Sequence, residues 1–124
     1  MTQQPLVATV QMVNIRSHVP VLLDLNESNY GQWRTFFASV LGKFSLTHHV
    51  VDPPPPQAFR SPEWSMNDHY IVNWLHTTCT KSVFDIVYRT DSFTYTFWGD
   101  LENLFRDNQL SRAVHYEAEF CSIC

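Results

Sequence analysis

LNESNYGQWRTFFASVLGKF, residues 25–44, decides the fold class of this chain. Ser28 and Asn29 are residue types that often cap the start of a helix. Apolar side chains then recur every three or four residues, at Tyr30, Trp33, Phe37, Val40, Leu41 and Phe44. This spacing places them on one face of a helix, so the stretch predicts an amphipathic helix whose aromatic stripe faces the protein core.

Two further helices are expected in the middle of the chain. Ser61-Pro62-Glu63 combines a cap, a first-position proline and an acidic first turn, which together open a helix. Trp74 and Leu75 continue its apolar pattern. Residues 80–89 predict a short helix with four apolar side chains inside, Val83, Phe84, Ile86 and Val87.

The last third of the chain predicts two more helices. Residues 94–108 carry apolar side chains at helical spacing, namely Phe97, Trp98, Leu101, Leu104 and Phe105. Ser111 is the expected cap of a fifth helix, whose buried row is Val114, Ala118 and Cys121. Because glycine is scarce, with three residues, a turn-rich sheet is disfavoured. The sequence therefore predicts an all-α fold, a small bundle of about five helices.

Prolines divide the chain into segments. Residues 1–24 contain Pro5 and Pro20, and we expect an extended or loosely ordered N-terminal arm, in which residues 7–13 form either a short strand or a loose tail. Residues 25–124 are the expected helical domain, interrupted at 51–60. The four consecutive prolines there favour polyproline II and a stiff connector. SH3 and WW modules bind such segments, but a single run of four prolines favours the plain connector.

Composition narrows the function classes. The chain has 124 residues, of which 44% are hydrophobic, and this is typical of one globular domain. The net charge is −4 and the eight Lys and Arg residues are scattered, which disfavours a nucleic-acid partner. Three cysteines and the lack of a signal sequence favour a reducing compartment, the cytoplasm or the nucleus. No apolar run is long enough to cross a membrane.

The sequence offers no complete metal site. Cys121 and Cys124 have the spacing of one half of a zinc site, but no second pair accompanies them. His69 and His76 are seven residues apart on one expected helix, with no acid or cysteine placed beside them. We therefore expect no bound zinc and no other cofactor.

A catalytic set is also missing from the sequence. Asp68 and His69 are adjacent on a helix, so their side chains do not face one another. His48 and His49 follow an expected helix end, where the helix dipole favours histidine. The four tryptophans offer stacking surfaces for bases, but their helical spacing favours core packing. We expect no enzymatic activity.

Two long stretches, LDLNESNYGQWRTFFASVLGKFSLTHHV (23–50) and FWGDLENLFRDNQLSRAVHYEAEF (97–120), resemble plant copia-type retrotransposon Gag polyproteins. The similarity runs from about residue 21 to residue 120, and the order and spacing of its pieces carry it. These pieces are Asn-Tyr-x-x-Trp (Asn29, Tyr30, Trp33), the Trp74-Leu75 pair, and Trp-x-x-Leu-x-x-x-Phe (Trp98, Leu101, Phe105).

The resemblance implies the N-terminal part of a capsid-like, all-helical Gag domain. Such Gag proteins assemble into shells around the RNA of their element. The family polyprotein continues with more capsid helices and a zinc knuckle, which these 124 residues do not contain. We therefore expect a truncated or domesticated Gag fragment.

The expected function is structural and acts by self-association, as a dimer or with related Gag. Apolar rows of the last two helices, expected to pack on absent helices, form the candidate interface: Leu104, Val114, Ala118 and Cys121. One alternative is an adaptor or decoy that binds a host protein or intact Gag. A second alternative is an RNA-binding module, which the negative net charge disfavours.

Overall fold

The computed structural model describes residues 7–87 and 93–106, and within them all regular elements are helical. They are α1 (Val7–Gln11), α2 (Ile15–His18), α3 (Tyr30–Lys43), α4 (His48–Val51), the 3-10 turn η1 (Gln57–Phe59), α5 (Pro62–Thr77), α6 (Lys81–Val87) and a helix over residues 94–106. The expected all-α fold class is confirmed. The fifth expected helix lies outside the described residues.

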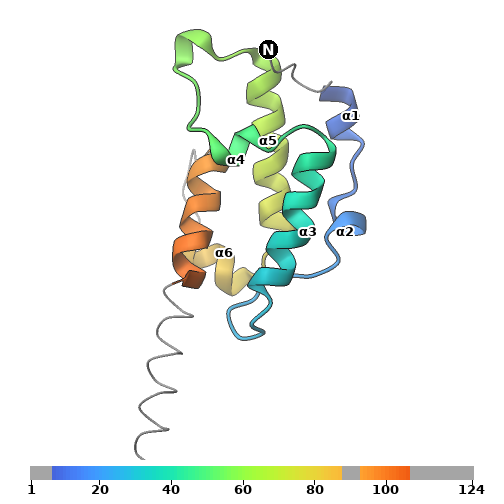
Figure 1. Cartoon of the computed structure of the whole chain (residues 1–124), viewed down its shortest axis with the longest axis vertical. Coiled ribbons are helices and arrows are strands. Elements are labelled where there is room, and N and C mark those ends of the chain that lie inside the picture. The colour runs from blue at the N-terminus through green and yellow to red at the C-terminus, as the bar shows by residue number, and fades with distance from the viewer. Residues whose placement is uncertain (1–6, 88–92, 107–124) are drawn as a thin grey trace, which may run out of the picture.

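Three long helices form the body of the bundle (Figure 1). The chain runs along α3 in one direction and returns along α5, and the 94–106 helix then runs in the same direction as α5 (Figure 1). The short α6 lies at the end of α5 (Figure 1). On the other side, α1 packs against α5, and α2 contacts both α3 and α5.

The facing sides of α3 and the 94–106 helix meet through rings that we call the aromatic seam: Tyr30, Trp33, Phe37, Trp98 and Phe105. The Tyr30 ring stacks on Phe105 with centroids 4.9 Å apart. The centroid of Trp98 lies 5.6 Å from that of Trp33 and 5.5 Å from that of Phe37. Because aromatic rings bury the most apolar area per residue, this seam is a large part of the core.

The remaining candidate core residues also lie inside the bundle. Those that are buried are Val40, Leu41, Trp74, Leu75 and Leu101, while Phe44 is half-buried against the same cluster. The apolar spacing in α3, α5 and the 94–106 helix therefore predicts the faces that these helices bury. In α6 the outcome is mixed, because Val83 and Val87 are buried but Ile86 is 56% exposed.

The start of α5 follows its sequence signals closely. Ser61 is the cap residue, and its Oγ accepts a hydrogen bond of 3.0 Å from the backbone N–H of Trp64. Pro62 occupies the first position, where its missing N–H leaves no hydrogen bond unmade. The helix ends at Thr77, shortly before residue 79, where the apolar pattern stops.

Residues 7–24 differ from the expected extended arm. They contain α1 and α2, and they bury Val10, Ile15, Val19 and Leu23 completely or nearly so. Burial of these four aliphatic side chains stabilises the packed segment relative to an arm that is exposed to water. Residues 1–6 lie outside the described part of the chain.

One isolated β-bridge ties this N-terminal segment to the end of α5. It pairs Leu23 with Cys79. The Leu23 N–H donates to the carbonyl of Thr78 at 2.8 Å, and the Thr80 N–H donates to the carbonyl of Leu23 at 3.0 Å. The bridge thus satisfies backbone groups that burial would otherwise leave unpaired.

Asn29 stands at the cap position of α3, but its side chain makes no capping hydrogen bond. Its Oδ1 instead accepts from the Asp24 N–H at 3.1 Å, and its Nδ2 donates to the Leu22 carbonyl at 2.7 Å. Asn29 therefore fixes the loop that joins the N-terminal segment to α3, where the sequence predicted a helix cap.

The proline connector has extended backbone angles at both of its ends, and short helical turns border it. The last residue of α4 is Val51, and η1 begins at Gln57. Between them, Asp52 and Pro56 have extended backbone angles, with ψ of 141° and 147°. Figure 1 shows this connector as a loop beside the first turns of α5.

Candidate functional site

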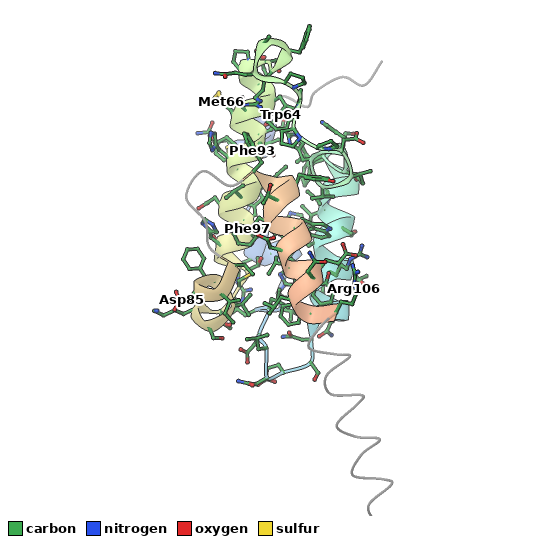
Figure 2. The ribbon with its side chains drawn as sticks, turned by 90° about the vertical axis from the view of Figure 1, so that its left-hand side faces the viewer. Trp64, Met66, Asp85, Phe93, Phe97 and Arg106 are labelled. Carbon is green, nitrogen blue, oxygen red and sulfur yellow. The ribbon has the colours of Figure 1, made fainter. Side chains whose placement is uncertain are left out.

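None of the four tryptophans presents a free ring face for stacking on a base. Trp33, Trp64, Trp74 and Trp98 are all buried. Phe97, which lies between α5 and the 94–106 helix (Figure 2), is also buried, and its ring centroid is 5.2 Å from that of His76. The aromatic residues expected in the core therefore pack on one another.

The described residues hold no cluster of three or more His, Cys, Asp or Glu side chains that could bind a metal ion. His69 is exposed whereas His76 is half-buried between Phe84 and Phe97, so the two histidines do not form a common ligand pair. Burial lowers the pKa of His76, which favours its neutral form. Cys121 and Cys124 lie outside the described residues.

Cys79 is buried beside the β-bridge. Burial raises the pKa of its thiol from an ordinary value of 9.0 to about 12. Because the thiolate is the reactive form of cysteine, Cys79 is a poor nucleophile at neutral pH. It acts as a small apolar side chain in the core.

A buried polar junction joins α4, α5 and the first residue of the 94–106 helix. It consists of His49, Asp68 and Thr94. The Nδ1 of His49 lies 3.0 Å from the Oδ1 of Asp68. The other carboxylate oxygen of Asp68 accepts a hydrogen bond of 3.2 Å from the backbone N–H of Thr94. The Thr94 hydroxyl donates to the backbone carbonyl of Asp68 at 3.1 Å.

Sequence reasoning missed this junction. His48 and His49 lie in the last turn of the four-residue α4, not at the end of α3, which ends at Lys43. The partner of Asp68 is His49, 19 residues earlier, and the neighbouring His69 points into solvent. No local spacing signals such a pair, because its members belong to separate elements.

The junction contains a histidine and a carboxylate, which are two members of a hydrolytic triad, but neither is accessible to a substrate. A carboxylate that holds Nδ1 leaves the Nε2 of a histidine as the reactive nitrogen. In this chain the Nε2 of His49 is buried and has no hydrogen-bond partner among the described residues. The Trp64 ring also stacks on His49 with centroids 4.9 Å apart. The histidine therefore has no route to a substrate and acts as a link between helices.

An open depression of about 450 Å³ lies where α4 meets the 94–106 helix. Its apolar and acidic lining residues are Val50, Val51, Tyr95, Trp98, Asp100 and Glu102. Val51 is 64% exposed and Tyr95 is 39% exposed. The lining of the depression thus combines apolar side chains with two carboxylates.

Only one of the four candidate interface residues falls on described structure. Leu104 is half-buried, packs against the core and does not line the depression. Val114, Ala118 and Cys121 lie outside the described residues. Among the exposed apolar residues in the described part of the chain, Val51 and Tyr95 line the depression, and the sequence did not single them out.

Comparisons with protein families, curated proteins and solved structures find no match to this chain. In the described parts of the chain, none of the helices combines the length and the apolar character needed to cross a bilayer.

Proposed function

We propose that this chain is a structural protein that acts by self-association, as a Gag-derived, capsid-like module would. A second copy of the chain covers the depression between α4 and the 94–106 helix. The observation that supports this role is the exposure of Val51 and Tyr95 side by side in one hollow. Apolar side chains gathered in this way favour a protein partner over water.

The charges around the depression suit a symmetric contact between identical copies. Asp100 and Glu102 line it. Arg34 lies over the Trp98 ring, 5.8 Å from its centroid, and Arg106 lies 3.9 Å from Glu102. In a two-fold interface each surface meets its own copy. Carboxylates of one copy can therefore face guanidinium groups of the other.

This role needs neither a catalytic residue nor a cofactor. It is the role that the resemblance to copia-type Gag implies, with a second copy or related Gag as the partner. The carboxylates at the depression repel phosphate, so the surface does not favour the alternative of RNA binding. The adaptor or decoy alternative uses the same surface with a different partner, and the test below separates it.

Sedimentation equilibrium of the purified chain tests the proposal. We expect a dimer with a dissociation constant in the micromolar range. Val51→Asp places a charge in the hollow and should weaken the dimer by about tenfold or more. Ile86→Asp is the matched control, because Ile86 is 56% exposed on α6 and does not line the depression.

Two results would contradict self-association at this surface. One is a monomer at concentrations up to about 100 μM, well above the dissociation constants of most specific interfaces. The other is equal weakening of the dimer by Val51→Asp and by Ile86→Asp. A monomer that binds intact copia-type Gag would favour the decoy alternative instead.

A further inference from the structure

The proline connector presents one edge outward. Polyproline II has three residues per turn, so residues three apart share an edge. Pro53 and Pro56 are three apart and both are exposed, whereas Pro54 and Pro55 are half-buried. The outward edge therefore has the Pro-x-x-Pro spacing that aromatic-lined grooves recognise.

Arg60 holds this edge in place. Its Nη2 donates a hydrogen bond of 2.8 Å to the carbonyl of Pro55. Its guanidinium carbon lies 4.7 Å from the ring centroid of Phe93 and 5.7 Å from that of Trp64. With α4 at one end and this clamp at the other, the connector is already ordered. Preordering lowers the entropy that binding would cost.

The depression between α4 and the 94–106 helix has apolar lining residues that could contact the proline edge. The exposed ring of Tyr95 lines the depression together with the aliphatic Val50 and Val51, while Trp98 is a lining residue whose ring is buried. The connector begins directly after Val51, so ligand and hollow lie next to each other on one copy. Two copies related by a two-fold axis can then exchange these parts, each connector meeting the other hollow.

Charge supports this exchange. Arg60 has no carboxylate partner among the described residues, while Asp100 and Glu102 line the depression. At the other end of the connector stands Asp52, and Arg34 lies over the Trp98 ring beside the depression. Each end of the connector therefore carries a charge opposite in sign to one in or beside the hollow of a second copy.

We propose that the edge formed by Pro53 and Pro56 docks on Tyr95 in the depression of a second copy of the chain. This inference rests on the proposed self-association and names the contact that produces it. The contact is reciprocal, so each dimer contains it twice. The connector thereby serves as a ligand as well as a link between α4 and α5.

Sedimentation equilibrium of three proline variants of the full chain tests the contact. Pro53→Ala and Pro56→Ala remove the outward edge, and each should weaken the dimer by about tenfold. Pro54→Ala is the matched control, because it also removes one proline and its backbone restriction but from the inward side. It should change the dissociation constant by less than about threefold. Circular dichroism checks that each variant keeps its helices.

A double-mutant cycle tests the pairing itself. Tyr95→Ala should weaken the dimer about as much as Pro53→Ala, and the double variant should be little weaker than either single variant. Additive losses would overturn the contact between Pro53 and Tyr95. If the wild type forms dimers and neither Pro53→Ala nor Pro56→Ala changes their dissociation constant, this inference is refuted while the proposed self-association still holds. A wild-type monomer would refute both.

Discussion

The aromatic seam and the polar junction hold the same bundle together by different means. In the seam, Tyr30, Trp33 and Phe37 meet Trp98 and Phe105 through ring contacts alone. In the junction, His49, Asp68 and Thr94 meet through directed hydrogen bonds inside the protein. The seam joins two helices along their length, whereas the junction joins three elements at one point.

The two regions differ in how they respond to change. A seam of packed rings loses free energy in proportion to the area and volume removed. In the junction the loss has another cause, because removal of one partner leaves the others buried without a hydrogen bond. Two measurements test this contrast, and a third concerns a buried thiol outside both regions; they follow in order of the expected effect.

Replacement of Trp33 by alanine should have the largest effect. Trp33 is fully buried at the centre of the seam, and the loss of such a side chain lowers the free energy of unfolding by about 3–5 kcal/mol. Phe36→Ala, on the same helix at a position 37% exposed, should lower it by about 1 kcal/mol. Urea unfolding measures both values, and similar losses would contradict the assignment of the core face.

Replacement of Asp68 by alanine should come next. It leaves the Nδ1 of His49 and the N–H of Thr94 without a buried acceptor, which we expect to lower the free energy of unfolding by about 2–3 kcal/mol. Asp85→Ala is the control. Asp85 lies on the outer side of α6 (Figure 2) and pairs with Lys81 in solvent, so its loss should cost about 0.5 kcal/mol or less. If the two variants unfold alike, the junction is not a structural link.

The smallest effect concerns pH and Cys79. Because burial raises the pKa of the thiol from 9.0 to about 12, the unfolded chain loses this proton before the folded chain does. The contribution of the thiol to stability is complete below pH 9 and falls as the pH rises toward 12, by at most about 1.4 kcal/mol per pH unit. Urea unfolding of wild type and Cys79→Ala between about pH 8 and pH 10.5 should show the wild type losing more stability. Parallel pH profiles would argue against a buried thiol.

Periodicity explains why the seam was predictable. Trp33 and Phe37 are four residues apart on α3, and Trp98, Leu101 and Phe105 follow one another at spacings of three and four on their helix. Each sequence segment therefore identifies its own buried face. The cap at Ser61 is local in the same sense, because it depends on a residue three positions away.

The features that the sequence did not predict depend on contacts between elements that are far apart in the chain. The pair of His49 and Asp68 depends on how α4 packs on α5, which no local pattern encodes. The N-terminal segment is ordered because Val10 and Leu23 are buried against helices that come later in the chain. Ile86 fits the helical pattern of α6 but faces water, since a short helix at the end of a bundle has neighbours on one side only.

The bridge between Leu23 and Cys79 has a kinetic consequence. It closes a loop of more than fifty residues through two backbone hydrogen bonds, and closing a loop of that length costs entropy of order 3 kcal/mol. Two hydrogen bonds do not offset that cost unless α3 and α5 have already come together. The N-terminal segment should therefore be the last part of the chain to dock during folding, and amide exchange at Leu23 and Thr80 should report its opening ahead of global unfolding.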